Sequence, residues 1–143
     1  MKYLIKGVLL NFAILITFSC KQQVQNENIV ELNSLIIRIS EIEIEPNYLD
    51  EYISILKEES EASVRLESGV ISIFPMFQKE NPTEIRILEI YASKEAYKSH
   101  LQTPHFKHYK TSTLKMVKSL RLVDMDAIDA ETMPEIFRKI KSN

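Results

Sequence analysis

The chain has 143 residues, of which 45% are hydrophobic and 27% are charged, and its formal net charge is −2. This length suits one domain with a conventional core, and the slightly acidic balance offers no basic surface that would recruit nucleic acid. Because the sequence contains a single cysteine, an intramolecular disulfide is excluded and the fold must be stabilised by burial.

The first 19 residues have the pattern of an export signal. Lys2 and Lys6 are followed by an uncharged, mostly aliphatic stretch from Gly7 to Cys20. As a helix this stretch would reach roughly 21 Å, short of the ~30 Å hydrocarbon core, which favours a cleaved signal over a membrane span. The run from Thr17 to Cys20 (TFSC) resembles a bacterial lipobox. We therefore expect cleavage before Cys20 and acylation of its thiol; a plain signal peptide with an incidental cysteine is the alternative.

This interpretation divides the chain into four parts. Residues 1–19 are the signal peptide, and residues 20–33, rich in Gln and Asn, are a lipidated tether. Residues 34–129 form the folded domain, and residues 130–143 are a tail with helical spacing that packs on its own domain or on a partner. We expect the protein in the cell envelope, where acylated Cys20 anchors it to a lipid bilayer on the periplasmic or outer-membrane side.

The first half of the domain predicts a strand, a helix and a second strand. Residues 34–45 (SLIIRISEIEIE) alternate apolar and acidic side chains, which is typical of a strand. Asn47 is the expected N-cap of an amphipathic helix that continues to about residue 66. Residues 70–77 (VISIFPMF) are apolar on both parities, so both faces of this strand should be covered. Pro75 cannot donate a ladder hydrogen bond and places the strand at a sheet edge or a bulge.

The second half predicts a strand, a broken helix and a last strand. Residues 83–91 form the strand that completes a hairpin. Ser93 should cap a short helix, and Thr103 with Pro104 should cap a second one. Its inward stripe would include Phe106, Tyr109, Thr113, Val117 and Leu120, and residues 121–128 alternate again as the final strand.

The order of these elements indicates an α+β fold of the ferredoxin-like βαββαβ type, with one antiparallel sheet and helices on one face. The face without helices then needs cover. Strands that are apolar on both parities suggest that a second copy of the chain covers it, which predicts a homodimer.

Glu89 and His100 are the candidate catalytic residues. Glu89 shares a strand face with Ile85, Ile87 and Tyr91, and a carboxylate in an apolar row must be paired or have a raised pKa. His100 lies on the inward face of its helix. A Glu89–His100 pair would satisfy both side chains. A structural hydrogen bond between core residues is an equally acceptable interpretation.

Two further groups of residues are weaker candidates. His105 and His108 are spaced to bind a metal together, but we expect solvated surface histidines and no metal, because ligand-spaced partners are missing. Strand residues of mixed character either line a pocket between sheet and helices or simply fill the core; they are Arg38, Ser40, Phe74, Met76 and Tyr91. Motifs for nucleotides, serine hydrolysis and metalloproteases are missing from the sequence.

The segment from Glu84 to Phe106 (EIRILEIYASKEAYKSHLQTPHF) resembles the antibiotic biosynthesis monooxygenase family, whose members include quinol monooxygenases. Matching positions are Glu89, Tyr91, His100 and the Pro104–Phe106 run, with Arg65, Glu67 and Gly69 upstream. The resemblance implies a dimeric α+β barrel and oxidation of a quinol or phenolic small molecule by O₂ without metal or flavin. The chain has no tryptophan, which separates it from the haem-degrading members.

The resemblance also implies roles for individual residues. His100 would be the base, and Glu89 would fix its tautomer. Tyr91, Phe74, Met76 and Phe106 would hold the aromatic ring, and Arg38 would favour its anion. We expect no cofactor.

Two non-catalytic alternatives stay open, so the sequence leaves enzymatic activity undecided. One is a lipoprotein that only binds an aromatic ligand in the same barrel. The other is an envelope-interaction protein, which predicts a filled pocket and no cavity near Glu89 and His100.

Overall fold

The computed structural model describes residues 34–129, 132–133 and 139. The predicted signal peptide, tether and Cys20 lie outside the described residues, as does most of the predicted tail. Among the helices of the described residues, none has the length and apolar character needed to cross a bilayer.

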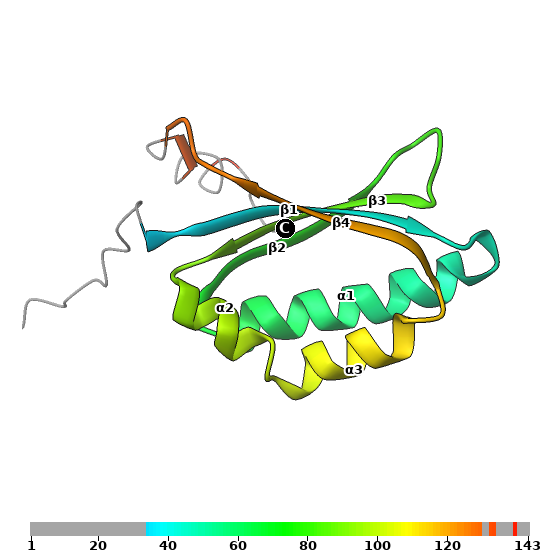
Figure 1. Cartoon of the computed structure of the whole chain (residues 1–143), viewed down its shortest axis with the longest axis horizontal. Coiled ribbons are helices and arrows are strands. Elements are labelled where there is room, and N and C mark those ends of the chain that lie inside the picture. Colours follow the sequence, from blue (N-terminus) through cyan, green and yellow to red (C-terminus); the bar gives the residue numbers. More distant parts are fainter. Residues whose placement is uncertain (1–33, 130–131, 134–138, 140–143) are drawn as a thin grey trace, which may run out of the picture.

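One antiparallel sheet is covered on one face by a layer of helices (Figure 1). The order along the chain is β1 (Ile36–Ile44), a 3-10 turn η2 (Pro46–Tyr48), α1 (Leu49–Leu66), β2 (Val70–Phe77), β3 (Glu84–Tyr91), α2 (Lys94–His100), α3 (Pro104–Thr113) and β4 (Val117–Met125). The strand order across the sheet is β2-β3-β1-β4, and neighbouring strands are antiparallel. The predicted ferredoxin-like α+β fold is therefore confirmed.

The caps of the broken helix follow the sequence signals. The Ser93 hydroxyl accepts a hydrogen bond from the backbone N–H of Ala96, and the Thr103 hydroxyl accepts one from Phe106. The predicted Asn47 cap is wrong. Because Pro46 begins a 3-10 turn, Asn47 lies inside that turn, and Tyr48 becomes the N-cap of α1 without a side-chain bond.

The last strand begins earlier than predicted. Helix α3 ends at Thr113, and β4 already starts at Val117 instead of residue 121. Between them the chain turns, and Met116, which is fully buried, donates its N–H to the carbonyl of Thr113. Thr113, Val117 and Leu120 fit helical spacing, but the stretch from Val117 onward also fits strand alternation, so the sequence pattern was ambiguous here.

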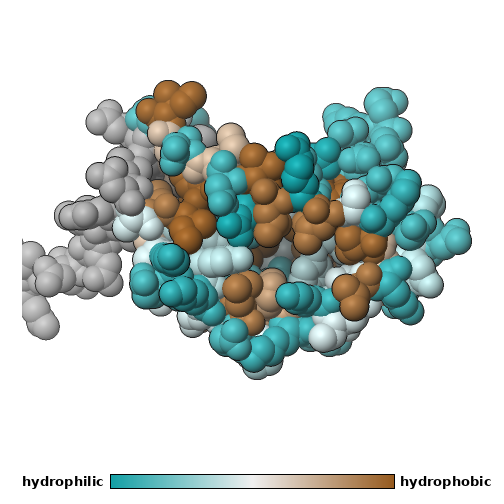
Figure 2. Space-filling model, in the orientation of Figure 1, coloured by the Kyte–Doolittle hydropathy of each residue, from teal (hydrophilic) through white to brown (hydrophobic). Residues whose placement is uncertain are grey.

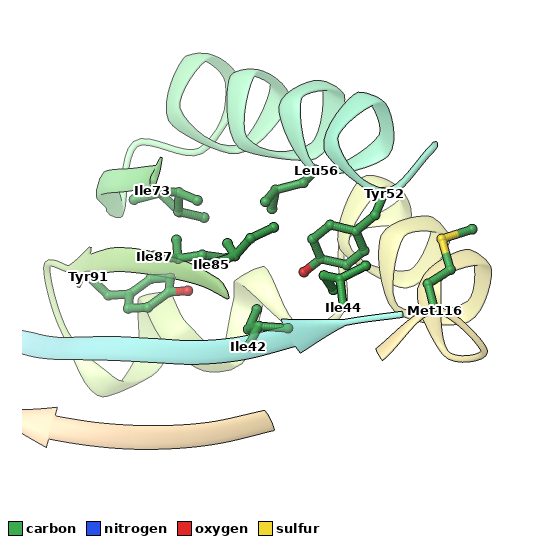
Figure 3. Close-up of a cluster of buried hydrophobic side chains, with 10 residues drawn as sticks. Ile42, Ile44, Tyr52, Leu56, Ile73, Ile85, Ile87, Tyr91 and Met116 are labelled. Atoms are coloured by element: carbon green, nitrogen blue, oxygen red, sulfur yellow. The ribbon is translucent and has the colours of Figure 1, made fainter. Parts of the chain in front are cut away.

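The core lies between the sheet and α1. Ile42 and Ile44 of β1 and Ile85 and Ile87 of β3 point toward α1, as Figure 3 shows. Tyr52 and Leu56 of α1 and Ile73 of β2 fill the space above them, and Met116 closes one end. Burying each large apolar side chain contributes about 1.5–3 kcal/mol, so this cluster stabilises the arrangement of α1 over the sheet.

Gly69 sets how closely α2 approaches the sheet. A Cβ added at Gly69 would lie 2.5 Å from the Cβ of Ala96, which is closer than two carbon atoms can pack. The carbonyl of Gly69 also accepts a hydrogen bond of 2.9 Å from the N–H of Ala92. Glycine is therefore required at this position to let α2, which carries His100, lie against the beginning of β2.

The face of the sheet opposite the helices exposes apolar side chains. Phe74 pairs with Leu88, and Leu88 pairs with Ile39, so these three side chains share that face. Phe74 is 58% exposed and Met76 is 41% exposed. No described helix or strand of the chain itself covers this side of β2, so the predicted cover would have to come from a second copy of the chain.

Candidate active site

A cavity of about 230 Å³ lies between the sheet and the helices. Its walls are mostly apolar, and its polar groups come from every layer of the fold. The polar and titratable lining residues are Arg38, Ser40, Glu59, Glu89, Tyr91, Tyr97, His100, Tyr109 and Lys110. The envelope-interaction alternative predicts a filled pocket, and this cavity contradicts that prediction.

The cavity brings together most of the residues singled out in the sequence. Arg38, Glu89, Tyr91, His100 and Phe106 all line it.

Phe74 and Met76 do not line this cavity, so placing them there was wrong. Register pairs Ile73 with Glu89, whose side chain faces the helices, and Phe74 therefore points the opposite way. Because β2 is apolar on both parities and has a bulge between Val70 and Ser72, its sequence does not reveal which residues face inward.

Glu89 is held by two hydroxyl groups. Ser40 donates a short hydrogen bond to Oε1 of Glu89, and the Tyr91 hydroxyl donates one of 2.8 Å to Oε2. Burial, together with the nearby Glu89 charge, raises the pKa of Tyr91 above its ordinary value. Tyr91 therefore keeps its proton and continues to donate to Glu89.

His100 is paired with two other carboxylates, so the predicted Glu89–His100 pair is not formed. The imidazole is 2% exposed; its Nδ1 lies 3.0 Å from Oε1 of Glu67, and its Nε2 lies 3.7 Å from Oε1 of Glu59. Both glutamates come from α1 and its C-cap, which pack beside α2. Spacing along the chain cannot reveal this proximity, because the partners are 33 and 41 residues away from His100.

Glu59 is the residue that sequence reasoning missed. It lies three residues after Leu56 and seven after Tyr52, on the inward stripe of α1, and this spacing was the available signal. The Ser63 hydroxyl donates a 2.8 Å hydrogen bond to it. Burial disfavours the ionised carboxyl and raises the pKa of Glu59, although Ser63 and His100 oppose this shift.

Glu67 has the opposite behaviour. Burial alone would raise the pKa of its carboxyl, but hydrogen bonds from His100 and His105 outweigh burial and lower it. The Nε2 atom of His105 lies 2.6 Å from Oε1 of Glu67. His105 is thus largely enclosed, contrary to the expected surface histidine, whereas His108 is exposed and its ring bonds only to Ser112 among the described residues.

Arg38 is tied to the rim of the cavity. Its Nε donates a 2.7 Å hydrogen bond to Asp124, and its Nη1 donates one of 2.9 Å to the Tyr97 hydroxyl. Burial alone would lower the pKa of Arg38, but the hydrogen bonds to Asp124 and Tyr97 outweigh burial and raise the pKa above its ordinary value. The guanidinium therefore stays charged. Its Cζ also lies 4.9 Å from the centre of the Tyr97 ring.

The cavity opens along β4, the edge strand that no described helix covers. Leu120 and Leu122 line the opening and are about half exposed. Figure 2 shows apolar residues gathered along this front edge of the sheet, above α3. An aromatic or aliphatic ligand would therefore meet an apolar border before it reaches the polar groups inside.

The fold and this cavity define a small ferredoxin-like α+β protein with a ligand-sized site between its sheet and its helices. The family model of the antibiotic biosynthesis monooxygenases matches residues 35–112, and the chain belongs to this family. Among curated proteins, none matches this chain.

Several solved structures are similar to this chain. A candidate antibiotic biosynthesis monooxygenase from Bacteroides thetaiotaomicron is 42% identical, with a TM-score of 0.69, over 79% of this chain and 100% of that one. A candidate monooxygenase from Lactobacillus acidophilus is 30% identical, with a TM-score of 0.62, over 64% of this chain and 43% of that one. A Caulobacter crescentus protein, 20% identical with a TM-score of 0.63 over 67% of this chain and 92% of its own, shares the fold.

The hydroxyl groups of Tyr52 and Tyr109 form a 2.6 Å hydrogen bond, and we expect removal of either hydroxyl to change the free energy of unfolding by a different amount. Tyr52 is fully buried, whereas Tyr109 lines the cavity, and burial raises the pKa of Tyr109 to about 12. Tyr109→Phe leaves the buried Tyr52 hydroxyl without its hydrogen-bond partner and should lower the free energy of unfolding by about 1–3 kcal/mol. Tyr52→Phe should cost less, because the Tyr109 hydroxyl can turn toward water in the cavity.

Urea unfolding of both single variants and the double variant measures these differences. The free energy of unfolding should fall less in the double variant than the sum of the decreases in the two single variants. The second substitution no longer leaves a buried hydroxyl without a hydrogen-bond partner. Equal single losses that add in the double variant would contradict this account of the pair.

Proposed function

We propose that this chain is a membrane-anchored, cofactor-independent monooxygenase that oxidises a quinol or phenolic small molecule with O₂. The observation that carries the proposal is the cavity itself, in which buried acid–base groups, Glu59 and His100, stand beside apolar walls. Membership of the monooxygenase family supports the same reaction class.

The dimensions of the cavity favour a single aromatic ring. A dry protein cavity of about 150 Å³ accepts benzene, so a volume of about 230 Å³ leaves room for a ring with small substituents. Phe106 and Tyr91 offer aromatic surfaces, and Ile73 takes the ring-holding place that the sequence assigned to Phe74. A longer substituent would leave through the opening lined by Leu120 and Leu122.

His100 is the proposed base. When its Nδ1–H donates to Glu67, the lone pair is on Nε2, on the side of Glu59. Glu67 thus takes the tautomer-fixing role that the sequence assigned to Glu89. A proton removed from the substrate by Nε2 can pass to Glu59, whose protonated form is favoured by burial.

The remaining polar groups stabilise the deprotonated ring oxygen. Arg38 keeps its positive charge at the rim and favours a phenolate over a phenol. Glu89, held by Ser40 and Tyr91, lies beside Arg38 on the sheet wall of the cavity and can accept a hydrogen bond from a second hydroxyl of a quinol.

The oxidation itself then needs no group beyond substrate and O₂. The phenolate gives one electron to O₂, and the two radicals combine at a ring carbon that bears hydrogen. The resulting peroxide anion takes back the proton held by His100 and Glu59. The peroxide O–O bond then breaks, its outer oxygen leaves as hydroxide, and the same ring carbon loses its hydrogen as a proton. The hydroxide and the proton leave as water, and the ring carbon becomes a carbonyl group that keeps the other oxygen atom.

Substituting the base should abolish O₂ uptake without unfolding the protein. With the detergent-solubilised chain and a set of substituted hydroquinones in an oxygen electrode, His100→Gln and Glu59→Gln should each lower turnover by about 10²–10⁴-fold, the usual contribution of general base catalysis. His108→Ala, an exposed histidine of the neighbouring helix, is the matched control and should keep wild-type turnover.

Two results would overturn this mechanism. Unchanged turnover in His100→Gln would remove the base. Wild-type protein that binds quinols, for example by fluorescence quenching, but consumes no O₂ would instead support the non-catalytic ligand-binding alternative.

We also propose that the chain forms a homodimer through the helix-free face of the sheet. Supporting observations are the exposed side chains of Phe74, Met76 and Met125 and the half-buried Leu88 and Val123 on that face. An apolar surface of this kind is costly to leave in water and suits a self-complementary interface.

A charge on this face should separate the two copies. Phe74→Glu is expected to shift the mass measured by light scattering from two chains to one, because the interface would have to bury a carboxylate. Leu114→Glu, an equally drastic change at a 75% exposed residue after α3, is the matched control and should leave the dimer intact. A Phe74→Glu protein that stays dimeric would exclude this face.

The proposed membrane attachment is supported by the sequence alone. The charged start, the short apolar stretch and the TFSC run fit a lipoprotein signal that ends before Cys20. Several acyl chains on one cysteine, each methylene worth about 0.8 kcal/mol when buried, would hold the domain at a bilayer surface.

Removing the thiol should release the protein from the membrane. Cys20→Ser, expressed in a bacterial host, should fail to incorporate labelled palmitate and should no longer partition with acylated lipoproteins in detergent phase separation. Ser19→Ala, which keeps a small residue before the cysteine, should be labelled like wild type. Palmitate labelling of Cys20→Ser would contradict the assignment of this site.

A further inference from the structure

We propose that Glu67, His100 and His105 form a binding site for one divalent transition-metal ion, for which Zn²⁺ fits the donor set. The site differs from the His105–His108 pair considered in the sequence, and it goes beyond the proposed oxidation, which uses no metal.

The donor atoms already converge. Each residue offers one ligand atom, and these atoms all lie within 4.8 Å of one another. Oε1 of Glu67 is 3.0 Å from Nδ1 of His100 and 2.6 Å from Nε2 of His105. A tetrahedral zinc ion with bonds of about 2.0–2.1 Å spaces its ligands by roughly 3.3 Å, so small side-chain movements would admit the ion.

The surroundings of His100 match those of a metal-binding histidine. Such histidines usually donate their second ring N–H to a carboxylate, which fixes the ring and makes the ligating nitrogen more basic. Nε2 of His100 faces Glu59 at 3.7 Å, and Glu59 is itself held by the hydroxyl of Ser63. This supporting carboxylate is a separate observation from the three converging donors.

The backbone holds the three donors in place from three elements. Glu67 is the C-cap of α1, His100 ends α2, and His105 is in the first turn of α3; these ends meet on one side of the helix layer (Figure 1). The junction between α2 and α3 is short and fixed, because the N–H and hydroxyl of Thr103 both donate to the carbonyl of His100.

Charge and access also favour a cation. Two carboxylates, Glu59 and Glu67, stand beside two imidazoles in a region where His100 is buried and His105 is only 18% exposed. The Glu67 carboxylate, whose ionised form is favoured by its hydrogen bonds to both histidines, supplies a negative charge that a dication would compensate. Glu67 also lines an outer groove with Ser99 and Thr103, and this groove is the route that we expect an ion to take.

Metal binding has a consequence for the proposed base. With Nδ1 bound to the ion, the remaining proton of the imidazole is on Nε2, and His100 can no longer accept a proton from a substrate. The ion would therefore switch off the proposed oxidation while fastening α1 to the α2–α3 junction. Binding of the ion does not itself depend on that oxidation.

Direct binding measurements test the site. Untagged full-length protein in detergent, stripped with a chelator, is titrated with Zn²⁺ in a calorimeter, and with Co²⁺ followed by its visible absorption. We expect one ion per chain, a roughly micromolar or tighter dissociation constant, and an intense tetrahedral Co²⁺ spectrum.

Matched variants separate this site from surface binding. His105→Ala and Glu67→Gln should each weaken Zn²⁺ binding by more than about tenfold and bleach the Co²⁺ spectrum. His108→Ala, three residues further along α3, should bind like wild type. Wild-type affinity in His105→Ala, or an equal loss in His108→Ala, would overturn the proposal and leave Glu67 as a hydrogen-bond bridge between two histidines. Neither outcome depends on O₂ uptake.

Discussion

The close approach of Gly69 to Ala96 positions the whole site. Any side chain at residue 69 would push α2 away from the beginning of β2. His100 ends α2, and the cap at Thr103 that begins α3 is bonded to the carbonyl of His100. A displacement of α2 would therefore move His100 away from the α1 carboxylates and shift Phe106 and Tyr109 on the far wall of the cavity.

The interior of the described domain contains several polar side chains, and every buried side-chain nitrogen and oxygen among the described residues has a hydrogen-bond partner. Glu89 accepts hydrogen bonds from two hydroxyls, and so does Glu59, from Ser63 and at longer range from Ser60. The buried tyrosines Tyr52 and Tyr91 donate or share their protons. A buried carboxylate without such partners would destabilise the fold by several kcal/mol. These hydrogen bonds stabilise acidic side chains in a cavity that is also lined by isoleucine and leucine. A ligand bound in this cavity would therefore contact groups that can accept or donate a proton.

Family membership and the residues of the site support different parts of the conclusion. The sheet order and the matched residues 35–112 establish the fold and the family, but one fold hosts many activities. The proposed phenol oxidation therefore depends on His100 between two glutamates, on charged Arg38 at the rim and on the apolar opening. The same histidine links this chemistry to the proposed metal site, because a proton and a metal ion compete for its two nitrogens.

The sequence by itself determined the order of strands and helices, the caps at Ser93 and Thr103, the edge position of the strand with Pro75, and the inward direction of Glu89 and His100. Those features depend on neighbours within a few residues, through alternation, helical spacing and local hydrogen bonds. Only the tertiary structure decided that His100 pairs with Glu59 and Glu67, that Ile73 and not Phe74 faces the cavity, and that His105 joins His100. These facts depend on register and on packing between elements far apart in the chain, which local patterns do not encode.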